Sequence, residues 1–164
     1  MSWPERFVVE QPITSVFVYG TLKRGQCRQS RWPRRPLDIR PGYVRGQLFD
    51  LGAYPALLCG AALRGFGRGG CDWVAGQLWR FSADDIEATL ARLDVIEVTN
   101  QPGQANLYDR IVVPVHDSPS DVPPTLALAY QFCNHAALGS WNRVPACQGS
   151  GLASWPISLQ SPSW

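Results

Sequence analysis

A carboxylate at the end of an apolar helical stripe is the residue whose position most strongly suggests chemistry. Ile86, Leu90 and Leu93 recur at spacings of four and three residues, which predicts one buried face of a helix. Glu97 continues this stripe, because eleven residues at about 100° each return to nearly the same direction. Burial would raise its pKa toward the range useful for general acid–base catalysis. Position alone leaves open that Glu97 turns into water or pairs with an arginine such as Arg110.

The turn after the first predicted strand, residues 13–20, is a candidate anion site. Tyr19, Gly20, Thr21 and Leu22 follow this β-branched and aromatic run. Consecutive backbone N–H groups in such a turn can converge on a carboxylate, and Thr21 adds a hydroxyl. Gly20 has no side chain to block close approach. The alternative is an ordinary strand exit with Tyr19 packed in the core.

Two polar side chains share a face of a later strand, residues 107–116. Tyr108 and Arg110 stand two positions apart, and alternate residues of a strand point to one side. If Tyr108 reaches a cavity, Arg110 would approach it as well. The alternative is that Tyr108 packs and Arg110 forms a surface ion pair.

The elements that must position these residues are short strands and one clear helix. The strand signals cover residues 13–20, 43–49, 54–59, 73–81, 107–116 and 125–132. The helix is predicted to begin at Ser82, with Asp85 at the capping-box position. Gly76 lies inside a strand, which indicates a bend or a close backbone approach. This content predicts an α+β domain, a small mixed β-barrel of about six strands with one or two flanking helices.

The chain is predicted to contain one domain followed by a tail. Residues 1–134 hold the periodic segments, and residues 59–72 read as an exposed glycine-rich loop. Residues 135–164 contain three tryptophans and several prolines without periodicity. Whether this tail packs across the barrel mouth or stays disordered is left open.

Composition excludes several function classes. A net charge of +2 is too small to indicate nucleic acid or an anionic membrane as a partner. No apolar run reaches the roughly 18 residues that a membrane span needs, and no signal peptide is evident. Five dispersed cysteines argue against a disulfide framework, and no His or Cys spacing indicates a metal site. We therefore expect a cytoplasmic protein without metal or cofactor; its oligomeric state is undetermined.

Three local patterns are set aside. Residues 65–70 match the letters of G-x-G-x-x-G, but the run that follows them reads as strand rather than helix. The arginines of residues 31–35 could contact RNA, although the low net charge favours a solvated loop. No G-x-S-x-G elbow and no Cys–His nucleophile pair is apparent.

Several short motifs recur together in a recognisable order over roughly residues 14–132. They are Val18-Tyr19-Gly20-Thr21-Leu22, Arg24-Gly25, Tyr54-Pro55, Gly76-Gln77-Leu78-Trp79, Leu93-Asp94-Val95-Ile96-Glu97, Tyr108-Asp109-Arg110 with Val112 and Val115, and Ala129-Tyr130. This ordered set resembles the γ-glutamylcyclotransferase-like family, of the γ-glutamylamine cyclotransferase type. The resemblance implies a small β-barrel flanked by helices, with the active site at the barrel mouth.

The resemblance also implies roles for individual residues. The turn of Tyr19, Gly20, Thr21 and Leu22 would bind the glutamyl α-carboxylate, and Glu97 would be the catalytic acid and base. The reaction would release 5-oxoproline and an amine from a small γ-glutamyl amide, with the leaving amine unspecified. Its intramolecular attack would need no cofactor. The alternative is a non-catalytic module that uses the same cavity, or the tryptophan-rich tail, to bind a partner.

Overall fold

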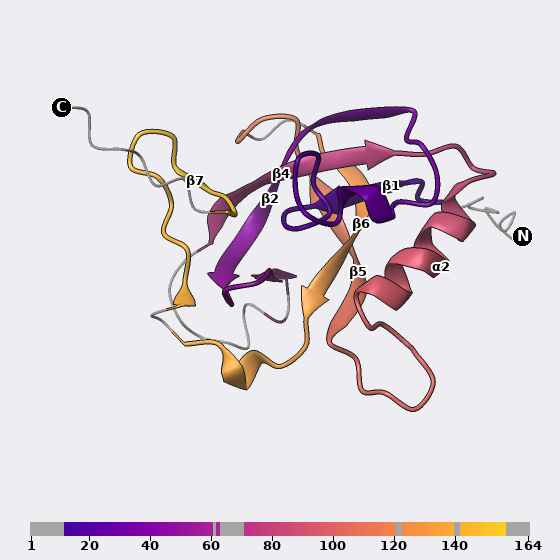
Figure 1. Ribbon diagram of the computed structural model, residues 1–164. Helices are drawn as coiled ribbons and strands as arrows, with labels where there is room; N and C mark the ends of the chain where they lie inside the picture. Colours follow the sequence, from indigo (N-terminus) through magenta and orange to yellow (C-terminus); the bar gives the residue numbers. More distant parts are fainter. Residues whose placement is uncertain (1–11, 61, 63–70, 121–122, 140–141, 157–164) are drawn as a thin grey trace, which may run out of the picture.

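The computed structural model describes residues 12–60, 62, 71–120, 123–139 and 142–156, and its strands form one curled mixed sheet (Figure 1). Six strands follow the order β3-β2-β4-β1-β6-β5, and β7 pairs with β4. The β1–β6 and β4–β7 pairs are parallel, and the other pairs are antiparallel. The strands are β1 (Ser15–Val18), β2 (Asp38–Asp50), β3 (Pro55–Leu58), β4 (Asp72–Arg80), β5 (Tyr108–Val115), β6 (Thr125–Phe132) and β7 (Leu152–Ala153).

All six predicted strands are present, and the α+β class with a small mixed barrel is confirmed in the form of a half-barrel. The main difference is β2, which begins at Asp38 rather than at residue 43. Pro41 and Gly42 argue against a strand locally, but both pair with β4, opposite Gln77 and Gly76. The predicted loop 59–72 lies largely outside the described residues.

Helix α2 (Ile86–Ile96) begins one turn later than predicted. Asp85 is its N-cap, without a side-chain capping bond, so the predicted cap by Ser82 is wrong. The carbonyl of Ser82 instead accepts the N–H groups of Asp85 and Ile86, at 3.1 and 3.2 Å, which closes a separate turn before the helix. The predicted apolar stripe is confirmed, since Ile86 and Leu93 are buried and Leu90 packs against the same core.

The two faces of the sheet carry separate apolar clusters. Alternate residues of β1 divide between them, with Val16 and Val18 in one cluster and Phe17 and Tyr19 in the other. The first cluster includes the buried face of α2, which covers that side of the half-barrel. The second cluster lies on the opposite face and is built mainly from β2, β4, β5 and β6. Strand β1 therefore lies between the two clusters.

Close approach of strands explains a glycine in β4. A Cβ on Gly76 would lie 2.5 Å from the carbonyl oxygen of Val18 and 2.6 Å from the ring of Phe17. Only glycine fits such a contact without displacing backbone, which confirms the predicted close approach. The sheet also curls far enough for Tyr43 of β2 to exchange two backbone hydrogen bonds with His116, just after β5, at 3.0 and 2.8 Å.

Residues 135–139 and 142–156 of the tail are described, and the second of these segments packs against the sheet. Trp155 is 8% exposed, and its indole N–H donates to Asp50 at 3.1 Å. Its carbonyl accepts the ammonium of Lys23, which directly follows the Tyr19–Leu22 turn. The tail therefore supports the turn from outside, whereas the domain division at residue 134 stays a prediction. All five cysteines are free thiols.

Candidate active site

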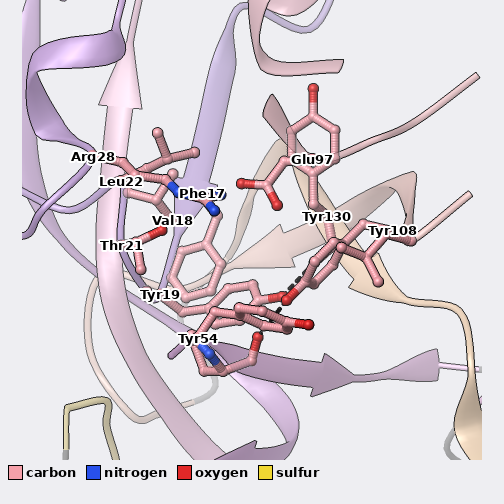
Figure 2. Close-up of a pocket in the computed structure, with 13 residues that line it drawn as sticks. Phe17, Val18, Tyr19, Thr21, Leu22, Arg28, Tyr54, Glu97, Tyr108 and Tyr130 are labelled. Atoms are coloured by element: carbon pink, nitrogen blue, oxygen red, sulfur yellow. Dashed lines mark hydrogen bonds between the residues drawn. The ribbon is translucent and has the colours of Figure 1, made fainter. Parts of the chain in front are cut away.

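A cavity of about 480 Å³, its open mouth included, lies beside the end of β1. It brings the predicted site residues Tyr19, Gly20, Thr21, Leu22 and Glu97 together from segments far apart in the sequence. Figure 2 shows the Glu97 carboxylate pointing into this space. The complete lining is Phe17, Val18, Tyr19, Gly20, Thr21, Leu22, Arg28, Tyr54, Pro55, Glu97, Leu107, Tyr108 and Tyr130.

Glu97 is the C-cap of α2, at φ −90° and ψ 0°, and its N–H donates to Leu93 at 2.8 Å. It is 9% exposed. Burial raises its pKa to about 7, against a weaker opposing attraction from Arg28. About half of such groups are ionised at neutral pH, so Glu97 can accept and return a proton with little free-energy cost. The alternative placements, in bulk water or paired with Arg110, do not occur.

The helix ends immediately after Glu97 in a Schellman motif with an unusual residue. The N–H of Val98 donates to Val95 at 3.3 Å, and that of Thr99 donates to Asp94 at 2.8 Å, as this motif requires. Val98 occupies the left-handed position at φ 52°, where glycine is usual. A β-branched side chain is strained there. The turn that holds Glu97 at the cavity therefore carries local backbone strain.

Val98→Gly is expected to stabilise the protein by about 1 kcal/mol, because glycine adopts this φ without the Cβ clash. The measurement is the free energy of unfolding from urea denaturation. Asn100→Gly is the matched control, since Asn100 has the same φ of 52°. Asparagine tolerates this region, and the change would remove a hydrogen bond with Asn106, so no gain is expected. A Val98→Gly protein no more stable than wild type would contradict the strain argument.

The Tyr19–Leu22 turn is held by its carbonyl groups. Gly20 accepts the N–H of Lys23 at 3.1 Å, and Thr21 accepts that of Arg28 at 2.8 Å. Leu22 accepts the indole N–H of Trp32 at 2.9 Å. Between described residues, no backbone hydrogen bond outside the helices and strands is donated by Gly20, Thr21 or Leu22. All three residues line the cavity.

Gly20 is required by packing. A Cβ at this position would lie 2.6 and 2.8 Å from the ring carbons Cγ and Cδ of Pro55. The proline ring is stiff, and Pro55 is the first residue of β3, where it pairs with Asp50 of β2. Its carbonyl also accepts the hydroxyl of Tyr108 at 2.7 Å. A side chain at Gly20 would therefore push apart two walls of the cavity.

Gly20→Ala is expected to destabilise the protein by about 1–3 kcal/mol, the usual range for overpacking. It should also lower substrate affinity, since Pro55 and Tyr108 both line the cavity. Urea denaturation measures the first effect, and the Michaelis constant reports the second. Gly149→Ala is the control, because a Cβ there meets nothing within 4 Å and should change stability little. Equal stabilities for the two variants would show that Pro55 yields without cost.

The tyrosines of β5 and β6 line the cavity, whereas Arg110 does not. Tyr130 donates to Asp94 at 2.7 Å, and Tyr19 donates to the carbonyl of Tyr130 at 2.5 Å. Burial raises the pKa of Tyr19, Tyr108 and Tyr130 well above the ordinary value, so these hydroxyls stay protonated. Arg110 pairs with Asp94 at 2.9 Å on the same side of the sheet. The idea that Arg110 accompanies Tyr108 to the cavity is therefore wrong.

Tyr54 and Arg28 are among the lining residues to which the sequence assigned no role. Tyr54 was part of a matched motif, but nothing in its neighbourhood indicated a cavity. Arg28 lies in residues 20–37, which have no periodicity, and it reaches the cavity only because its loop folds back onto Thr21. No local signal could have found it. In the described part of the chain, no three His, Cys, Asp or Glu residues gather as metal ligands would.

The family model for γ-glutamyl cyclotransferase, AIG2-like proteins matches residues 16–144, well over half of the chain. The chain belongs to this family. Among γ-glutamyl cyclotransferase relatives, the γ-L-glutamyl-butirosin B γ-glutamyl cyclotransferase of Niallia circulans is 35% identical over 106 residues. That match covers 63% of this chain and 59% of the relative. The chain thus matches less than two thirds of that relative's length.

Solved structures show the same fold. An AIG2-like protein from Mus musculus superposes with a TM-score of 0.54 and 21% identity, over 90% of this chain and 98% of that one. YkqA from Bacillus subtilis superposes with a TM-score of 0.50 and 21% identity, over 74% of this chain and 36% of that one. Both similarities concern the fold of the family. In the described residues, no helix is both long and apolar enough to cross a bilayer.

Proposed function

We propose that this protein is a γ-glutamyl cyclotransferase that releases 5-oxoproline and an amine from a small γ-glutamyl amide. Glu97 is the general acid and base of this proposal. Its main support is the buried Glu97 carboxylate, with a pKa of about 7, in the same cavity as the Tyr19–Leu22 turn. Membership of the family supports the reaction class. A cytoplasmic location remains an expectation from the sequence.

In the proposed binding step, the substrate α-carboxylate lies against the backbone N–H groups of Gly20, Thr21 and Leu22. Several convergent N–H donors bind a carboxylate more strongly than they bind a neutral acceptor. The aliphatic part of the glutamyl group lies among the rings of Tyr54 and Tyr108 (Figure 2). This wall keeps water away from the γ-carbonyl, which favours cyclisation over hydrolysis.

In the proposed chemical step, the Glu97 carboxylate removes a proton from the α-ammonium group. The free amine attacks the γ-carbonyl carbon of the same molecule and forms the five-membered ring. The protonated Glu97 then returns its proton to the leaving nitrogen as the C–N bond breaks. The ring nitrogen loses its second proton through Glu97 to the departing amine, so the products are 5-oxoproline and an ammonium ion, and Glu97 is again ionised. Holding both reacting groups in one molecule lowers the barrier by up to several kcal/mol.

A substrate panel tests this proposal. Wild-type protein is incubated with γ-glutamyl amides whose leaving amines are neutral, anionic or cationic, and 5-oxoproline and free amine are quantified. The expected result is equal amounts of both products from at least one class. Absence of 5-oxoproline above the background of Glu97→Gln for every compound would overturn the reaction. Tight binding without turnover, unchanged by Glu97→Gln, would instead identify a binding module.

A further inference from the structure

The cavity contains one positive and one negative side chain. Of its lining residues, only Arg28 and Glu97 carry a formal charge, and the others are aromatic, aliphatic, glycine, proline or threonine. Figure 2 shows Arg28 on the side of Thr21 and Leu22, across from Glu97. The two charges thus belong to opposite walls. A half-buried guanidinium at a cavity wall is suited to bind an anionic ligand in that cavity.

Arg28 is fixed relative to the substrate turn. Its backbone N–H donates to Thr21 at 2.8 Å, so the Arg28 main chain follows the Tyr19–Leu22 turn. Its side chain is only partly exposed. Among the described residues, no ion pair includes Arg28. Its positive charge acts at longer range. It tends to lower the pKa of Glu97 and of Tyr108, which opposes the larger increase that burial causes.

We propose that Arg28 binds the α-carboxylate of the γ-glutamyl group, as a charged anchor opposite Glu97. This inference rests on the proposed cyclotransferase function. The α-carboxylate and the α-ammonium are attached to one carbon, so their binding partners must face each other across a few ångströms. Glu97 receives the ammonium proton, and Arg28 lies on the wall that bears the anion-binding N–H groups. A guanidinium also matches a carboxylate in shape, with two parallel donors.

A carboxylate on the leaving amine is the competing ligand for Arg28. A γ-glutamyl amino acid has such a group, whereas a γ-glutamyl alkylamide has none. The two assignments differ in what they predict. An anchor for the α-carboxylate serves every γ-glutamyl substrate and also the 5-oxoproline product. An anchor for the carboxylate of the leaving amine serves only γ-glutamyl amino acids and contributes nothing to the binding of 5-oxoproline.

Product binding provides the first test. Isothermal titration compares the binding of 5-oxoproline with that of 2-pyrrolidinone in wild type and three variants. 2-Pyrrolidinone is the same ring without the carboxylate. Arg28→Gln is expected to weaken 5-oxoproline binding by about 10–100-fold, the range for a hydrogen bond to a charged group, and to leave 2-pyrrolidinone unaffected. Arg28→Lys keeps the charge without the paired donors and should fall between. Arg31→Gln, an exposed arginine of the 3-10 helix Gln29–Arg31, should bind like wild type.

Turnover provides the second test. γ-Glutamyl-glycine and γ-glutamyl-methylamide are compared as substrates, because only the first has a carboxylate on its leaving amine. Arg28→Gln should raise the Michaelis constant for both by a similar factor. A rise for γ-glutamyl-glycine alone, or unchanged 5-oxoproline binding in a variant with native circular dichroism, would overturn the assignment. Wild-type protein that binds 5-oxoproline through Arg28 but releases it from no compound of the substrate panel would refute the proposed reaction instead.

Discussion

Glu97→Gln is expected to reduce 5-oxoproline release by roughly 10²–10⁴-fold, the usual contribution of a positioned general acid–base. Glutamine keeps the size of the side chain but can neither take the ammonium proton nor return one to the leaving nitrogen. The loss should appear mainly in kcat, because the proposed α-carboxylate contacts with the Tyr19–Leu22 turn and Arg28 remain. Initial rates of 5-oxoproline formation, measured at saturating substrate, report this effect directly.

Glu87→Gln is the matched control for this experiment. Glu87 belongs to the first turn of the same helix and is exposed to solvent, so its replacement should leave the rate near that of wild type. A Glu97→Gln protein that retains a rate within about threefold of wild type would show that proton transfer follows another route. A raised Michaelis constant with unchanged kcat would assign Glu97 to substrate binding.

The same substitution is expected to remove a pH dependence of stability. The folded-state pKa of Glu97 is about 7, against an ordinary value of 4.5, so the folded protein holds this proton more tightly than the unfolded chain. The resulting stabilisation is fully present below the unfolded pKa and is lost as pH rises through the folded pKa. Wild type should therefore lose about 3 kcal/mol more than Glu97→Gln between roughly pH 4.5 and 8.

Urea denaturation of both proteins at pH 4.5 and pH 8 measures this difference. Other titrating groups are shared by wild type and variant, so the difference between their pH dependences isolates Glu97. Its sign is decisive: relative to wild type, the variant should gain stability as pH rises. Equal pH dependences would mean that Glu97 is solvated in the folded protein, which would also remove the physical basis for its catalytic pKa.

Helical periodicity was sufficient to locate Glu97 beside a core. The 3.6-residue repeat reports which side of a helix is buried, and Ile86 and Leu93 are buried as predicted, with Leu90 partly buried between them. The start of the helix was not predictable in the same way. Ser82 and Asp85 are equally suitable as first residues by local chemistry, and backbone hydrogen bonds to the Ser82 carbonyl close a separate turn between them.

Strand signals behaved similarly. In β5 the buried residues Val113 and Val115 are two positions apart, because pleating alone sets that spacing. The early part of β2 had no such signal, since Pro41 and Gly42 are poor strand formers. Pairing with β4 supplies the hydrogen bonds that hold these residues extended. Local propensity thus identified strand centres, and long-range pairing determined the strand ends.

The sequence by itself determined that a carboxylate ends an apolar stripe and that a glycine-containing turn ends the first strand. Both properties are local, because they depend on side-chain type and on the repeat of a single element. Only the tertiary structure decided that Glu97 and Gly20 line one cavity, that Arg28 joins them, and that Arg110 pairs with Asp94 instead. These outcomes depend on how the curled sheet and its loops bring separate segments of the chain into contact, and the repeat of a single element does not encode such contacts.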